Sequence, residues 1–208
     1  MKTYALILAL GLMSACAPAS DTTQSSQAPL EASPQTSETQ TTMANTTMNL
    51  NEIDFTSIRG EPMPFSDFSD QVVLVVNTAS RCGYTAQYAG LQELHTTFED
   101  KGFTVLGVPS NDFGAQEPGT EEQIATFCEI NYGVEFPLTR KTTVVGAAQH
   151  PFYRLAVESL GDKAEPKWNF HKVLVGRDGR FLQAYPSSIR PADVELVADI
   201  ERALTRVQ

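Results

Sequence analysis

Two short apolar runs with a helical pattern between them constrain the fold of this chain most strongly. The first run is Val72–Asn77 and the second is Phe103–Val108. Their length and their β-branched residues indicate strands that are buried on both faces. Between them, residues 85–99 place apolar side chains at steps of three and four, the pattern of an amphipathic helix. This succession predicts a right-handed βαβ unit with parallel strands.

The pattern that follows completes an α/β domain. Residues 120–123 (TEEQ) form a capping-box sequence, which predicts a helix that runs to about Tyr132 and ends at Gly133. Residues 172–176 and 180–185 flank an Arg-Asp-Gly turn and predict a β-hairpin. A last amphipathic helix is expected over about 191–204, and an N-terminal β-hairpin around 53–65. The order of elements predicts a thioredoxin-like fold, with a central mixed sheet flanked by helices.

The first fifteen residues have the features of a secretory signal. Lys2 precedes an apolar run, and small residues precede Cys16. The sequence LMSA before Cys16 resembles the lipobox of bacterial lipoproteins, in which the cysteine after the removed signal is lipidated. An ordinary cleaved signal with an incidental Cys16 is the alternative. We predict a signal peptide over residues 1–15 and a lipid anchor at Cys16, which would place the protein in a bacterial cell envelope, facing the periplasm and held to a membrane.

The next segment is too polar to fold. Within residues 16–47, Ser, Thr, Gln, Ala and Pro dominate and no aromatic residue occurs. Such a composition cannot bury enough apolar surface to offset its chain entropy, so we predict a disordered tether. Residues 48–208 then form one domain with 14 basic and 22 acidic side chains. With a net charge near −8 and no basic stripe, we do not expect nucleic-acid binding.

Cys82 stands where the first predicted strand has ended and the first helix is about to begin. Ligands bind beyond the carboxyl ends of strands in such sheets, and free N–H groups before a helix favour a thiolate. Cys82 lacks the second cysteine of a CxxC pair, which disfavours local dithiol exchange. On this evidence alone, a buried structural thiol, a disulfide with Cys128 and a nucleophile all remain open. The histidines are scattered, and we expect no metal or other cofactor.

Three ordered motifs resemble the signatures of the glutathione peroxidase family. They are NTASRCGYT over 77–85, GVPSNDFGAQEPG over 107–119 and KWNFHKVLV over 167–175. The resemblance spans about residues 50–205, and it implies a glutathione-peroxidase-like domain that reduces hydrogen peroxide and organic or lipid hydroperoxides. It also implies a catalytic tetrad. Cys82 would be the peroxidatic thiol, and the other three members would be Gln116, Trp168 and Asn169.

The motifs depart from the family pattern at three positions. Ser110 stands where the family usually has a cysteine outside the tetrad, Asp112 replaces an amide, and His171 often corresponds to a threonine. If Asp112 faced the pocket, its charge could oppose the thiolate. These departures bear on the tuning of the site more than on the reaction.

The resemblance also implies a resolving cysteine, Cys128, as in the non-selenium, thioredoxin-dependent members of the family. A Cys82–Cys128 disulfide would form during turnover and would be reopened by a thioredoxin-like protein or glutathione. Because Cys128 is expected in a helix, bond formation would require local unwinding. The short connection over 159–166 lacks the insert of tetrameric relatives, so we expect a monomer. The alternatives are a peroxide sensor that relays oxidation to a partner, and a binding module without catalysis.

Overall fold

The computed structural model describes residues 49–206 of this 208-residue chain. The predicted signal, the lipid anchor at Cys16 and the tether lie outside the described residues and stay predictions. Among the described residues, no helix combines the length and apolar character needed to cross a bilayer.

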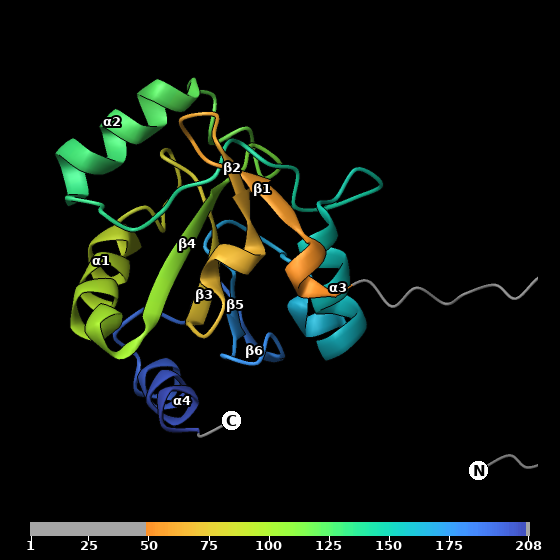
Figure 1. The fold of residues 1–208 in the computed structure, drawn as a ribbon. Coiled ribbons are helices and arrows are strands. Elements are labelled where there is room, and N and C mark those ends of the chain that lie inside the picture. Colours follow the sequence, from red (N-terminus) through yellow and green to blue (C-terminus); the bar gives the residue numbers. More distant parts are fainter. Residues whose placement is uncertain (1–48, 207–208) are drawn as a thin grey trace, which may run out of the picture. The chain divides into compact units, whose positions relative to one another are not determined.

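The core of the domain is a four-stranded mixed sheet in the order β4-β3-β5-β6 (Figure 1). The strands are β3 (Val72–Thr78), β4 (Phe103–Pro109), β5 (Lys172–Val175) and β6 (Phe181–Tyr185). β3 and β4 are parallel, which confirms the βαβ unit, whereas β5 runs antiparallel to both β3 and β6. The predicted hairpin of β5 and β6 and the mixed character of the sheet are therefore also confirmed.

Alternate residues of β3 enter two separate hydrophobic clusters, one on each face of the sheet. Leu74 and Val76 pack with residues of α1 (Gln87–Phe98), α2 (Glu121–Tyr132) and α4 (Val194–Thr205).

Val73 and Val75 lie on the opposite face, where α3 (Pro151–Leu160) and the N-terminal hairpin contribute the facing side chains. Figure 1 shows these two groups of elements on opposite sides of the sheet. The all-apolar sequence of the strand follows from this double coverage.

The N-terminal hairpin consists of β1 (Asp54–Thr56) and β2 (Pro62–Pro64), as predicted. Short 3₁₀ segments lie on either side of it, at Leu50–Glu52 and Phe65–Phe68. The hairpin adds aromatic rings to the core, since the rings of Phe55 and Phe152 are 5.9 Å apart.

The predicted helix ends match in α2 and are displaced by one to three residues in α1 and α4. In α2, the Thr120 side chain accepts from the N–H of Gln123 and the Gln123 side chain accepts from the N–H of Thr120, so the capping box is confirmed. Helix α1 ends at Phe98 and is followed by a 3₁₀ turn, Glu99–Lys101. Gly102, after this turn, has a left-handed backbone conformation. α4 begins at Val194 instead of Pro191 because Arg190 and Asp193 close a turn there: the Arg190 N–H donates to the Asp193 carboxylate, and the Asp193 N–H donates back to the Arg190 carbonyl.

Helix α3 was not predicted. It begins with Pro151 after His150, whose ring accepts from the N–H of Phe152 at 3.4 Å. Phe152, Tyr153 and Ala156 are buried on one side of this ten-residue helix. The proline at its first position was the available signal. A further 3₁₀ turn, Asp162–Ala164, follows it.

Candidate active site

The topology of the sheet brings the three motifs to one edge. Thr78 at the end of β3 lies opposite Pro109 at the end of β4, so the segments that follow both strands leave from the same edge. β5 runs the other way and begins there, because Lys172 pairs with Val76. The segments that carry Cys82, Gln116 and Trp168-Asn169 therefore converge at this edge, as expected for a site beyond the carboxyl ends of parallel strands.

Cys82 lies in a turn between β3 and α1, with a free thiol that is 8% exposed. Thr85 holds this turn: its hydroxyl accepts from the Cys82 N–H at 3.0 Å and lies 2.9 Å from the Ala79 carbonyl. Because α1 begins only at Gln87, Cys82 is not at the helix N-terminus itself, and the expectation from the helix dipole is weakened. The Tyr84 backbone N–H, 3.4 Å from the sulfur, supplies a local donor instead.

The amides of Gln116 and Asn169 contact each other directly. The Asn169 Nδ2 donates to Gln116 Oε1 at 3.0 Å, across 53 positions of sequence. Asn169 is fully buried and Gln116 is half-buried. The Gln116 carbonyl also accepts from the N–H of Arg81, at 3.0 Å, so the amide pair is joined to the residue next to Cys82.

Trp168 lies at the surface of the same edge, 39% exposed. Its ring is 5.8 Å from that of Phe113, and its carbonyl accepts from the Asn77 side chain at 3.1 Å. As the neighbour of Asn169 in the chain, it brings an aromatic ring and an indole N–H donor to this edge of the sheet.

Asn77 and Lys172 hold the turn that presents Trp168 and Asn169. The Asn77 carbonyl accepts from the N–H of Phe170 at 2.6 Å, and the buried Lys172 ammonium donates to the Phe170 carbonyl at 2.7 Å. Burial lowers the pKa of Lys172 to about 7, an effect that nearby Asp193 partly opposes. Phe170 itself has a φ of 64°, a conformation that costs free energy unless its surroundings fix it. Sequence reasoning missed both supports, although each is a polar residue at the end of an apolar strand.

The departures at Asp112 and Ser110 are accounted for by contacts with backbone N–H groups of loops. The Asp112 carboxylate accepts from the N–H of Val144 at 2.6 Å, so it fastens a loop and is not directed at the sulfur. The buried Ser110 hydroxyl lies 3.4 Å from the N–H of Asp112. The possibility that Asp112 opposes a thiolate therefore finds no support.

His171 is 4% exposed, and burial lowers its pKa to about 4, with the charge of Lys172 adding to the effect. The histidine is thus neutral in the folded protein at neutral pH. An unfolded histidine titrates near 6.5, so the unfolded state binds more protons between pH 6.5 and 4. The stability that neutral His171 maintains is present above pH 6.5 and is lost as the pH falls toward 4.

We therefore expect the free energy of unfolding of His171→Thr to depend less on acid pH than that of the wild type. The difference between the two proteins should change by about 3 kcal/mol between pH 7.5 and 4, at about 1.4 kcal/mol per pKa unit. Urea unfolding at several pH values measures it. Parallel pH curves would show that His171 does not titrate as stated.

Cys128 is fully buried in α2 and is not in a disulfide. The pKa of its thiol is raised to about 11, mainly by burial; the hydrogen bond with the Tyr88 hydroxyl partly opposes this rise, and the charge of Glu117 adds to it. As a neutral buried thiol it is unreactive in this conformation.

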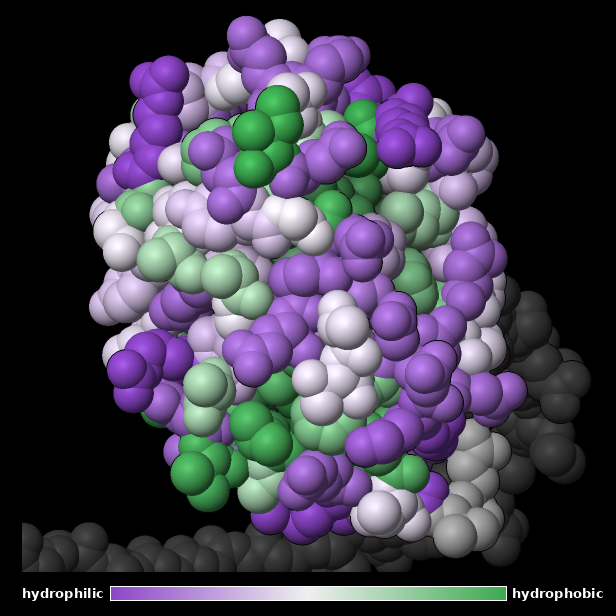
Figure 2. Space-filling model, turned by 90° about the vertical axis from the view of Figure 1, so that its left-hand side faces the viewer, coloured by the Kyte–Doolittle hydropathy of each residue, from purple (hydrophilic) through white to green (hydrophobic). Residues whose placement is uncertain are grey.

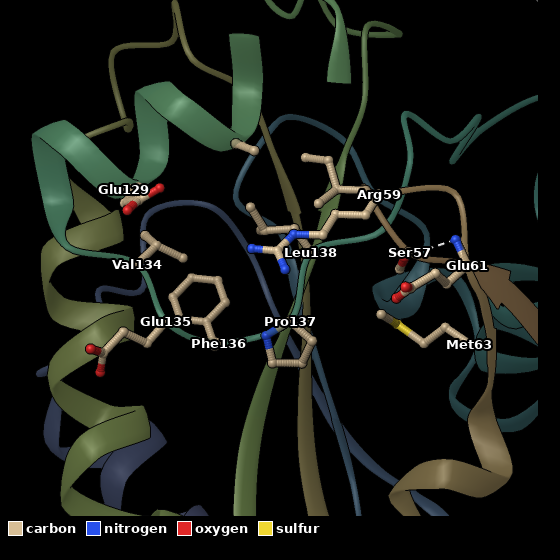
Figure 3. Close-up of a pocket in the computed structure, with 12 residues that line it drawn as sticks. Ser57, Arg59, Glu61, Met63, Glu129, Val134, Glu135, Phe136, Pro137 and Leu138 are labelled. Atoms are coloured by element: carbon tan, nitrogen blue, oxygen red, sulfur yellow. Dashed lines mark hydrogen bonds between the residues drawn. The ribbon is translucent and has the colours of Figure 1, made fainter. Parts of the chain in front are cut away.

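A hollow of about 330 Å³ adjoins the Cys82 turn and is lined by Ser80, Arg81, Glu117 and Phe127, among others. A separate pocket of about 310 Å³ lies between α2, the β1–β2 loop and residues 134–138 (Figure 3). In this view the Arg59 side chain reaches across it, and no predicted site residue lines it. Within residues 49–206, no group of three or more His, Cys, Asp or Glu forms a metal site.

Comparison with known proteins gives the family of this chain. A family model described as glutathione peroxidase matches residues 50–156. This chain belongs to the glutathione peroxidase family. Two curated relatives of this family are similar over most of their length. The hydroperoxy fatty acid reductase gpx1 of Synechocystis is 46% identical over 71% of this chain and 91% of its own. The glutathione peroxidase-like peroxiredoxin gpx1 of Schizosaccharomyces pombe is 47% identical over 70% and 92%.

Solved structures confirm the fold. The apo crystal structure of Trgpx superposes with a TM-score of 0.63 at 29% identity, covering 77% of this chain and 97% of that one. Trypanosomal GPX1 (T. cruzi) gives a TM-score of 0.59 at 26% identity, over 77% of this chain and 100% of its own. A thioredoxin-family thiol:disulfide interchange protein of Chlorobium tepidum, 15% identical, has a TM-score of 0.54 and covers 76% of this chain and 97% of its own. The glutathione peroxidase domain thus has the predicted thioredoxin-like fold.

Proposed function

We infer that this protein is a thiol peroxidase that reduces hydroperoxides through Cys82 as the peroxidatic cysteine. The observation that carries this is the hydrogen bond of Asn169 to Gln116, beside the Cys82 turn. Two motifs far apart in sequence thereby present amide groups at the edge of the sheet where a free thiol lies. A buried structural cysteine would not require this arrangement.

The first half of the reaction consumes the peroxide. The Cys82 thiolate attacks one peroxide oxygen, so that an S–O bond forms as the O–O bond breaks. The departing oxygen takes up a proton and leaves as water or an alcohol, and Cys82 becomes a sulfenic acid. We assign to Gln116, Asn169 and the Trp168 indole the task of donating hydrogen bonds to the sulfur and to the departing oxygen, where charge develops.

The second half requires Cys128 as the resolving cysteine. Its thiolate attacks the Cys82 sulfur, an S–S bond forms, and hydroxide leaves as water. A thioredoxin-like dithiol protein, or glutathione, then reduces the disulfide by thiol–disulfide exchange. Only Ile124 and Cys128 are fully buried among the twelve residues of α2, and Phe127 and Tyr132 are partly buried, so few side chains hold this helix to the core. Local unwinding of α2 would expose the Cys128 thiol and release it from the environment that keeps it neutral.

Mass spectrometry after one exposure to hydrogen peroxide tests this mechanism. In the wild type we expect a Cys82–Cys128 disulfide. In Cys128→Ser we expect Cys82 as sulfenic acid or its overoxidised forms, because no thiol resolves it. Turnover with a thioredoxin-like reductant should fall by at least about tenfold in Cys128→Ser. A wild type that consumes peroxide without forming this disulfide would contradict the role of Cys128 but not that of Cys82.

The same assay separates an enzyme from a relay. An enzyme consumes many equivalents of peroxide with a general dithiol reductant, whereas a sensor that passes its oxidation to one partner turns over poorly without it. The Synechocystis relatives named hydroperoxy fatty acid reductases lead us to propose lipid hydroperoxides among the substrates. The predicted lipid anchor at Cys16 would hold the enzyme near such molecules.

We also propose that the protein is a monomer. Figure 2 shows the face that carries α1 and α2, where apolar residues form small patches separated by hydrophilic ones. Large exposed apolar side chains among the described residues are few: Tyr84, Ile130, Trp168 and Val194. Such scattered residues do not make the continuous patch that a stable interface buries.

A further inference from the structure

We propose that Glu117 is a positioning residue that holds the Cys82 turn closed for the reaction with peroxide and must release it before Cys128 can resolve the product. This inference rests on the proposed function. It concerns a carboxylate outside the predicted tetrad.

The contact that carries the proposal joins Ser80 to Glu117. The Ser80 N–H donates to Glu117 Oε2 at 2.9 Å, and the Ser80 hydroxyl donates to the same oxygen at 3.1 Å. We call these two bonds the Ser80–Glu117 latch. With the bond from the Arg81 N–H to the Gln116 carbonyl, three hydrogen bonds fasten residues 80–81 to residues 116–117. Cys82 and the Gln116 side chain are therefore fixed relative to each other.

Glu117 is an unusual residue because its carboxyl group is buried in the protein. It is 1% exposed, and its Oε1 is buried without a hydrogen-bond partner. Its N–H donates to the Asn111 side chain at 2.8 Å, and this bond fixes the backbone at Glu117. A buried carboxylate with a free oxygen is costly, so removing the latch should not cost much overall stability. Apolar side chains could make a purely structural contact here at a lower cost in free energy.

The closed latch favours the oxidation of Cys82 by peroxide and opposes the formation of the disulfide with Cys128. While it is closed, residues 80–81 stay fastened to residues 116–117, and we infer that this keeps the Cys82 turn beside the amide pair for attack on peroxide. Disulfide formation, however, needs the fully buried Cys128 thiol to reach the Cys82 sulfur with disulfide geometry, and we infer that the Cys82 turn or α2 moves for this step. Glu117 lies just before Thr120, the N-cap of α2, and therefore ties the start of this helix to the Cys82 turn. Opening the latch frees both partners of the disulfide.

The experiment measures the two steps separately by rapid mixing with hydrogen peroxide. Trp168 is the only tryptophan, and its fluorescence reports events at this edge. Oxidation of Cys82 is the phase whose rate rises with peroxide concentration, and disulfide formation is the phase whose rate does not. Glu117→Gln keeps the shape of the side chain without its charge, and Ser80→Ala removes the hydroxyl donor. Glu158→Gln, an exposed acid on α3, is the control for lost charge.

We expect Glu117→Gln to slow Cys82 oxidation by about tenfold and to speed disulfide formation by at least about threefold. Ser80→Ala should shift both rates in the same directions by less, and Glu158→Gln should shift neither. A purely structural defect would slow both steps or accelerate unfolding alone. If both rates fall together, or neither changes, the proposal is wrong. If Glu117→Gln does not fold, Ser80→Ala decides by the same criteria.

The pH dependence gives a second readout. Burial raises the pKa of Glu117 above its usual value, while Ser80, Lys141 and Arg81 partly offset the shift; Tyr88 and Cys128 are its other titratable neighbours. Protonating Glu117 in the wild type should reproduce the effect of Glu117→Gln. The ratio of the Cys82 oxidation rate of the wild type to that of Glu117→Gln should therefore approach one as the pH falls. A ratio that stays constant overturns the proposal, whereas a wild type that never consumes peroxide overturns the proposed function instead.

Discussion

Replacing Cys82 with serine is expected to abolish hydroperoxide reduction, with a loss of at least about 10³-fold in kcat/KM. The serine hydroxyl fits the same turn, and the Thr85 contacts to the backbone of residue 82 remain possible. It is not ionised near neutral pH, however, and an alcohol is a poor nucleophile toward an O–O bond. Consumption of hydrogen peroxide and of an organic hydroperoxide, with a thioredoxin-like reductant in excess, measures the loss.

The matched control for this result is Cys128→Ser. It removes the other thiol of the described domain and should retain the first oxidation of Cys82 at the wild-type rate. Urea unfolding of Cys82→Ser should show a free energy within about 1 kcal/mol of the wild type, because the change is nearly isosteric. Activity in Cys82→Ser above about a tenth of the wild-type value would place the nucleophile elsewhere.

Local sequence patterns predicted the elements that interactions between residues close in sequence, or the burial of a whole strand, determine. The β-branched runs predicted β3 and β4 because a strand covered on both faces needs apolar residues throughout. The capping box at Thr120 predicted the start of α2 because its two hydrogen bonds are formed by residues three apart. Helix α3 was missed because its signal is a single proline after a histidine cap.

The candidate site could be predicted only as far as its motifs reach. Cys82, Gln116, Trp168 and Asn169 were named from three motifs, and their roles stay predictions. Their supports could not be found in this way, since the Glu117 carboxylate and the Lys172 ammonium act through contacts between distant segments. Asp112 is the opposite case. Its charge suggested an effect on Cys82, but its carboxylate accepts a hydrogen bond from the Val144 N–H instead.

The hydrogen bond between Asn169 and Gln116 predicts that their effects on peroxide reduction are not additive. We expect Gln116→Ala and Asn169→Ala each to lower the second-order rate constant for Cys82 oxidation by about 100-fold, the usual effect of removing a donor to developing charge. Each replacement also leaves the other amide without the partner that orients it. The double variant should therefore be little slower than the worse single variant, with a coupling energy of about 2–3 kcal/mol.

Single-turnover oxidation followed by Trp168 fluorescence in a Cys128→Ser background measures this cycle, because the resolving step is then absent. Asn51→Ala, which changes an exposed amide near the start of the described chain, is the control and should leave the rate constant unchanged. Additive losses that lower the double variant by about 10⁴-fold would mean that the two amides act independently. The hydrogen bond of 3.0 Å would then serve packing alone, and the charge that develops on the departing oxygen would have to be stabilised by Trp168 and backbone donors such as the Tyr84 N–H.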